Sequence, residues 1–208
     1  MTTHPTPPTV SRRGALRAGA AGLAALLSLG HFTPALAEEL ARLTRGRPMT
    51  GPRLVSILQA ERAKWNALLA QVGPNHMETP GAVGEWSVKD LVAHLTWYEQ
   101  AVVEGARQVL GGGTFTRRRP EGVSLDEQNA RILAASRARP ASAVLAEAEA
   151  TFTDLVTLLA AVPQDLLNDP HILGLPDDMV PWMGVANNSY AHYREHEPTL
   201  RAYIARMA

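Results

Sequence analysis

Four long stretches of this chain repeat apolar residues with the period of an α-helix, and proline or glycine stands at or near their ends. They cover residues 52–72, 88–110, 141–162 and 183–207. Apolar residues spaced three and four positions apart fall on one face of a helix. No alternating run between turn signals indicates a strand. The pattern therefore predicts an all-α protein built as a four-helix bundle.

Two helix starts carry side chains that can cap them. Ser87 is followed by Asp90 three positions later, and Ser124 is followed by Glu127 in the same way. A serine with an acidic residue three positions on satisfies backbone N–H groups that the first helical turn leaves free. We expect a helix to begin directly after each serine. The second of these is a short extra helix that ends near Arg137.

Proline and glycine also mark the segments between the helices. We expect loops over residues 75–86 and 111–123. Residues 164–182 contain three prolines, and a loop of this length is a candidate lid over a functional site. Pro198 lies inside the last helical stretch. It removes the hydrogen bond to the carbonyl of Arg194, so we expect a kink there.

Residues 1–37 have the three parts of a signal peptide. Arg12 and Arg13 lie in a basic segment, residues 18–30 form an uncharged run rich in Ala and Gly, and residues 35–37 offer small side chains for cleavage. The paired arginines resemble a twin-arginine (Tat) signal. We expect cleavage after Ala37, transport by the Tat export machinery, and a periplasmic or secreted protein. An amphipathic helix or an uncleaved anchor is the alternative.

The composition limits what the rest of the chain can do. After the signal peptide we expect a linker over residues 38–49 and one helical domain over residues 50–208. The 20 basic and 20 acidic residues give a net charge of zero, which argues against nucleic acid as a partner. The chain has no cysteine, so disulfides, Cys-ligated zinc and a thiol nucleophile of its own are excluded.

Three histidines fall on the apolar faces of two predicted helices. His192 and His196 are four residues apart on the last helix, and His94 lies on the second long helix. Histidines at positions i and i+4 are neighbours on one face and can bind one metal ion. A third imidazole from a packed helix leaves one coordination position open, as in catalytic sites. The alternative is a hydrogen-bonded core cluster without metal.

Other polar residues are candidates for a site beside these histidines. Glu61 falls on the apolar face of the first helix, where a carboxylate is unexpected. It either lines a pocket as a general base or lies at the edge of the face and reaches water. By helical phase Glu195 and Glu197 point away from the histidines, so Glu61 is our candidate catalytic base. Asn129 and Tyr98 are candidates for orienting a substrate.

The segment GEWSVKDLVAHL, residues 84–95, resembles the loop-to-helix signature of the DinB-like superfamily. The segments NARI at residues 129–132 and HYREH at residues 192–196 then follow in the expected order. Their sequences are most similar to the ClbS/DfsB branch of the superfamily. This resemblance covers roughly residues 50–206. It implies a DinB-like four-helix bundle in which His94, His192 and His196 bind one divalent metal ion. Zinc, nickel and iron all suit imidazole ligands.

The resemblance suggests an exported metal-binding protein that hydrolyses or otherwise modifies a small, perhaps toxic, molecule. Relatives also include thiol-dependent isomerases and transferases. We rank thiol-dependent chemistry below hydrolysis, because an exported protein would lack the low-molecular-weight thiol of the cytoplasm. The alternative is a non-catalytic protein that sequesters a small molecule or a metal. A third interpretation is a homodimer whose bundle packs against a second copy. Neither the substrate nor the metal follows from the sequence.

Overall fold

The computed structural model describes residues 47–112, 118–169 and 180–207. The expected signal peptide, residues 1–37, lies outside the described residues, as do most of the expected linker and much of the candidate lid. Within the described ranges, no helix is both long enough and apolar enough to cross a membrane.

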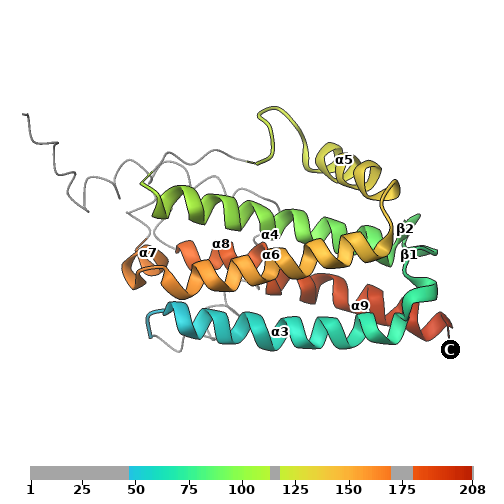
Figure 1. The fold of residues 1–208 in the computed structure, drawn as a ribbon, viewed down its shortest axis with the longest axis horizontal. Helices are drawn as coiled ribbons and strands as arrows, with labels where there is room; N and C mark the ends of the chain where they lie inside the picture. The colour runs from blue at the N-terminus through green and yellow to red at the C-terminus, as the bar shows by residue number, and fades with distance from the viewer. Residues whose placement is uncertain (1–46, 113–117, 170–179, 208) are drawn as a thin grey trace, which may run out of the picture.

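Four long helices lie side by side and form the bundle (Figure 1). They are α3 (Gly51–Val72), α4 (Val88–Leu110), α6 (Ala141–Ala161) and α9 (Tyr190–Met207). Their apolar faces meet in one core, in which Leu54, Leu91 and Leu155 are almost completely buried. Each such side chain contributes roughly 1.5–3 kcal/mol by its burial. The all-α bundle predicted from the sequence is therefore confirmed.

The predicted capping residues begin the helices as expected. The Ser87 hydroxyl accepts a hydrogen bond from the Asp90 N–H at 3.2 Å, and the Asp90 carboxylate accepts from the Ser87 N–H at 3.0 Å. Ser124 accepts from the Glu127 N–H at 3.1 Å and begins α5 (Leu125–Arg137). The bonds are reciprocal at Ser87 and one-way at Ser124, and they satisfy N–H groups that have no partner inside the helix.

The short helix α5 is fastened to the start of α4. The Lys89 ammonium donates to the backbone carbonyls of Arg137 at 3.5 Å and Arg139 at 2.9 Å, at the carboxyl end of α5. The Ser136 hydroxyl also donates to the Asp90 carboxylate. Figure 1 shows α5 on the outer side of α4. Its first turns thereby become part of the wall of a cavity.

Two short strands occupy part of a segment that we expected to be a loop. They are β1 (Pro80–Val83) and β2 (Trp86–Ser87), and they pair antiparallel. Gly84 turns the chain between them with φ 57°, a conformation that favours glycine. Strands of four and two residues are too short to show an alternating pattern, which is why the sequence did not predict them.

The fourth helix is interrupted rather than continuous as predicted. A short helix, α8 (Pro181–Asn187), precedes α9, and Asn188 and Ser189 lie between them. The Asn188 amide donates to the Gly184 carbonyl at 2.8 Å, and the Ser189 hydroxyl donates to the Val185 carbonyl. Such side-chain bonds compete with the backbone hydrogen bonds of a helix. Helix α9 itself continues past Pro198 to Met207.

Smaller helical pieces occupy parts of the other predicted loops. A single 3₁₀ turn, η1 (Pro74–His76), follows α3, and α7 (Gln164–Asn168) follows α6.

The start of α3 approaches α6 closely at Gly51, where a Cβ atom would lie 2.5 Å from the Leu159 carbonyl oxygen. A glycine is required there because the two backbones touch.

Candidate metal centre

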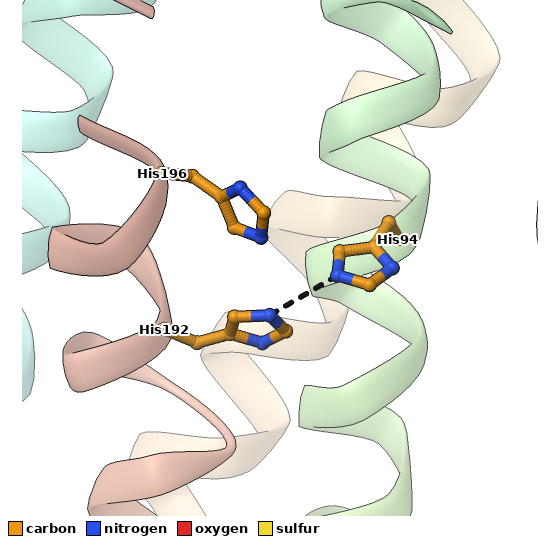
Figure 2. Close-up of side chains that lie close together, drawn as sticks. All are labelled: His94, His192 and His196. Carbon is orange, nitrogen blue, oxygen red and sulfur yellow. Dashed lines mark hydrogen bonds between the residues drawn. The ribbon is translucent and has the colours of Figure 1, made fainter. Parts of the chain in front are cut away.

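The three predicted histidines come together between α4 and α9 (Figure 2). Nε2 of His94 lies 3.0 Å from Nε2 of His192. Each of the three rings offers one nitrogen, and these nitrogens all lie within 4.8 Å of one another. His192 and His196 project from one face of α9, as the spacing of four predicts. His94 faces them from α4, so one ion between the rings can contact all three.

The surroundings keep the three imidazoles neutral. Burial, reinforced by the neighbouring His196 and opposed by a side-chain interaction with Asn129, lowers the pKa of His94 to about 3. Burial also lowers the pKa of His192 well below its usual value, with His94 as the next cause. Burial lowers the pKa of His196 as well, although the nearby Glu195 carboxylate opposes the shift. Neutral imidazole is the form that binds a metal.

The cluster has polar atoms that its protein neighbours do not satisfy. Among the described residues, neither Nδ1 of His94 nor Nδ1 of His192 has a hydrogen-bond partner. A buried polar atom without a partner costs on the order of 1–3 kcal/mol. Two neutral rings with facing Nε2 atoms can share one proton, or both can donate a lone pair to a cation. The donor set and its protonation therefore fit a divalent metal ion.

A cavity of about 310 Å³ opens beside the histidines. The short strands supply Val83 and Trp86 to its wall, α4 supplies Leu91 and Tyr98, and α5 closes another side. The remaining described lining residues carry hydrogen-bonding groups or lie at the start of α5: Leu125, Asp126, Asn129, Asn187, Asn188 and Glu195. A cavity of this size and mixed lining suits a small molecule.

Asn129 and Tyr98 lie together in this cavity. The Tyr98 hydroxyl donates to Oδ1 of Asn129 at 3.3 Å. The ring of Tyr98 lies 5.0 Å from the ring of His94 and 4.9 Å from the ring of His192, between centroids. Burial raises the pKa of Tyr98; Arg119 opposes this shift and Glu195 adds to it. The hydroxyl is therefore protonated at neutral pH and available as a donor.

Glu61, our candidate base, is placed elsewhere. Its carboxylate accepts two hydrogen bonds from Arg194, at 3.1 and 2.8 Å, and a third from Lys64 at 2.9 Å. The hydrogen bond from Arg194 is the largest of the effects that lower the pKa of Glu61. Glu61 is not among the described residues that line the cavity. We therefore withdraw the general-base role, because an ion-paired carboxylate outside the cavity cannot reach a substrate there.

Glu195 is an unexpected member of the cavity wall. We expected its side chain to point away from the histidines, yet it lines the cavity at the exposed rim. Residue 195 follows His192 by three positions, and a spacing of three also places side chains on neighbouring parts of a helix. That spacing was the signal available in the sequence. Glu195 thus replaces Glu61 as the candidate catalytic carboxylate.

Comparison with protein families matches residues 58–186 to the mycothiol maleylpyruvate isomerase N-terminal domain. The matched segment contains His94 and ends before the histidine pair of α9. No curated protein gives a match.

Solved structures share the fold. An uncharacterised protein from Escherichia coli UTI89 is 18% identical, with a TM-score of 0.62 over 76% of this chain and 95% of its own. The colibactin self-resistance protein ClbS, in complex with a dsDNA, is 18% identical, with a TM-score of 0.61 over 76% and 96%. A Streptococcus pneumoniae protein is 10% identical, with a TM-score of 0.63 over 77% and 94%. The predicted DinB-like helical bundle is thus confirmed.

One expectation is wrong. We excluded nucleic acid as a partner because basic and acidic residues balance in this chain. ClbS, which has a similar fold, has been solved in complex with a dsDNA. Net charge describes the whole chain and says nothing about how charges are distributed over one face. A balanced composition therefore does not exclude nucleic acid.

Proposed function

We propose that this chain, which belongs to the mycothiol maleylpyruvate isomerase N-terminal domain family, is a metal-dependent enzyme that modifies a small molecule. The observation that carries this proposal is the meeting of three neutral imidazoles at a cavity of about 310 Å³. His94, His192 and His196 would hold the ion and leave a position open toward the cavity. When bound, a divalent ion there supplies Lewis-acid chemistry: it polarises an oxygen or lowers the pKa of water.

The other cavity residues have separable roles. Tyr98 and Asn129 form a hydrogen-bonded pair that can orient a carbonyl or hydroxyl group of the substrate. Glu195 is the described carboxylate nearest in sequence to the histidines on the cavity wall, and we assign to it the transfer of a proton. Trp86 and Leu91 provide apolar surface that excludes water from one side.

Two reactions fit this site and differ in the nucleophile. The predicted signal peptide supports water as the nucleophile, and hence a hydrolase that acts on a small, perhaps toxic, molecule outside the cytoplasm. The family match supports a thiol nucleophile, since its name refers to mycothiol. Turnover of a candidate substrate with and without a low-molecular-weight thiol distinguishes the two. A requirement for the thiol would overturn the hydrolase.

The export proposal rests on residues 1–37 alone. We infer that Arg12 and Arg13 direct the chain to the Tat machinery, so that replacing both with lysine leaves the protein in the cytoplasm. Fractionation of cells that express each form tests this. Equal export of both forms would contradict it.

Metal analysis of the full chain, purified without a histidine tag, is the first experiment on the site. We expect about one equivalent of a divalent metal in the wild type and none in His192→Ala, because two imidazoles alone bind weakly. His76→Ala is the matched control, since His76 is an exposed histidine that belongs neither to the cluster nor to the described lining of the cavity. It should bind metal like the wild type.

Two outcomes would change the proposal. Absence of metal in the wild type, even after zinc, nickel or iron is supplied, would overturn the metal site and leave the histidines as a core cluster. Metal with no turnover of any small molecule would favour the alternative, a non-catalytic protein that sequesters a ligand or the metal itself.

A further inference from the structure

The reverse face of α9 is attached to other helices at the level of the histidine pair. Tyr193 and Arg194 lie between His192 and His196 in the sequence. Successive residues on a helix point about 100° apart, so these two side chains leave the helix on another side. They reach α3, against which α9 mainly packs. The segment that presents two candidate ligands is thus held from behind.

Arg194 makes the first attachment. Its guanidinium donates from Nε to Oε2 of Glu61 at 3.1 Å and from Nη2 to Oε1 at 2.8 Å. This is a two-pronged pair between α9 and α3, and Glu61 is buried, with 7% of its surface exposed. A bidentate arginine–carboxylate pair restricts orientation as well as distance. It therefore resists both rotation and sliding of α9.

Tyr193 makes the second attachment, and it joins three helices. Nη1 of Arg62 on α3 donates to the Tyr193 hydroxyl at 2.9 Å, and that hydroxyl donates to the Glu99 carboxylate on α4. Arg62 and Glu99 also form an ion pair at 3.5 Å. The Tyr193 ring stacks on Trp65 of α3, 5.6 Å between centroids. We call Arg62, Glu99 and Tyr193 the junction.

The histidines lack the support that metal-binding imidazoles usually have. Such rings ordinarily donate their second nitrogen to a carboxylate or carbonyl, which fixes the orientation of the ring. In the described residues, Nδ1 of His94 and Nδ1 of His192 have no such partner. Ring placement must then depend more strongly on the position of the backbone that carries it. For His192 and His196 that backbone is α9.

The backbone hydrogen bonding of this stretch of α9 is interrupted on both sides. It begins directly after the interruption at Asn188 and Ser189, and Pro198, which cannot donate a backbone hydrogen bond, follows two residues after His196. A rotation of α9 by ten degrees would displace an imidazole nitrogen by roughly 1 Å. Metal sites tolerate errors of only about 0.2 Å.

We propose that the Glu61–Arg194 pair and the junction are positioning elements, which hold α9 so that His192 and His196 meet His94 around one ion. This inference rests on the proposed metal site. It gives Glu61 a role in the site without contact with the metal or a substrate. Glu61 and Tyr193 are positioning residues and not catalytic ones.

Zinc affinity of the full chain tests the proposal, measured by competition with a chromophoric chelator at a temperature where every variant is folded by circular dichroism. We expect Glu61→Gln to bind zinc about tenfold more weakly than the wild type, a loss usual for outer-shell changes. Lys64→Gln is the matched control. It removes the other partner of Glu61, but that partner is on α3 itself and is 63% exposed. Its zinc affinity should stay within about twofold of the wild type.

Tyr193→Phe provides a second variant that keeps the ring stacked on Trp65 and removes only the hydroxyl. It should also weaken zinc binding, and cobalt bound to it should show visible absorption bands shifted from those of the wild type. A purely structural role would lower the melting temperature of both variants and leave zinc affinity and the cobalt spectrum unchanged.

The outcomes separate this inference from the proposed function. If the wild type binds none of zinc, nickel and iron, the metal site itself fails, and the positioning role fails with it. If the wild type binds zinc and both variants bind it equally well, the metal site stands and the positioning role is overturned. Equal weakening by Lys64→Gln would also overturn it, because that variant keeps the Glu61–Arg194 pair and the loss would then not depend on the attachment of α9.

Discussion

Two buried polar clusters lie in the same bundle, and they differ in how their members are paired. In the junction a cation, a carboxylate and a hydroxyl meet: Arg62 donates to Tyr193, which donates to Glu99. In the histidine cluster three groups of one kind meet, and two of them keep an Nδ1 atom without a partner in the described structure. The junction pairs a cation with an anion, although Nε of Arg62 and Oε2 of Glu99 have no hydrogen-bond partner among the described residues. The histidine cluster has no such opposite charges, and the Nε2 atoms of His94 and His192 face each other.

This difference suits the two clusters to different roles: the junction stabilises the fold, and the histidine cluster can bind a ligand. A polar cluster that contains its own cation and anion has no need of a ligand, and removing one member leaves the other charge in an apolar interior. A cluster of neutral imidazoles has no internal counter-charge, and its facing nitrogens can bind a cation. The cavity beside the histidines gives such a ligand access. The rings of Trp65 and Phe152 pack against Tyr193 and Arg62 of the junction.

The largest effect is expected from breaking the junction. Arg62→Met should lower the free energy of unfolding by about 3 kcal/mol or more at neutral pH, because it leaves Glu99 buried without its cation. Chemical denaturation measures this. Arg107→Met is the matched control: Arg107 pairs with Asp154 at 2.6 Å, but both side chains are about half exposed. That change should cost less than about 1 kcal/mol. Equal costs would show that the junction is no more than another surface pair.

The pH dependence of the junction gives the next largest effect. Burial raises the pKa of Glu99 from 4.5 to about 7, against the opposing effect of Arg62. The folded state therefore holds a proton that the unfolded state has lost between these pH values. This contribution to stability is present below pH 4.5 and is lost as the pH rises through 7, at about 1.4 kcal/mol per pH unit.

Glu99→Gln removes this dependence, because glutamine resembles the protonated acid at every pH. Denaturation at several pH values between 4.5 and 7 should show the wild type losing stability relative to Glu99→Gln as the pH rises. Glu85→Gln is the control, since its side chain is 93% exposed and its ion pair is with Arg137, outside the junction. A constant difference between the wild type and Glu99→Gln over this range would refute the account of Glu99.

The smallest effect is expected in the histidine cluster. In chelator-treated protein, His94→Leu should change the free energy of unfolding by no more than about 1 kcal/mol and can raise it, since the lost imidazole had an unsatisfied nitrogen. Without chelator, added zinc should raise the melting temperature of the wild type and leave that of His94→Leu unchanged. A loss of several kcal/mol in the chelated protein would show that the histidines are a stabilising core cluster like the junction.

The features that the sequence predicted correctly depend mostly on residues that are close together along the chain. Ser87 and Ser124 marked helix starts because capping involves residues three positions apart, which the sequence shows directly. His192 and His196 shared a face for the same kind of reason. The sequence also placed His94 on an inward face, because the apolar face of a bundle helix points toward the other helices. That this face meets His192 and His196 was implied only by the resemblance to the DinB-like superfamily.

Only the tertiary structure decided which neighbour each inward side chain meets. Helical phase placed Glu61 on an inward face, but it does not distinguish the side facing the histidines from the side facing Arg194. The junction joins residues from three helices, so no spacing in the sequence signals it. Glu195 lies near the boundary between two faces, and the rotation of α9 set by its packing turned it toward the cavity. Spacing along a helix is a local property, whereas the rotation of one helix against another is set by the whole core.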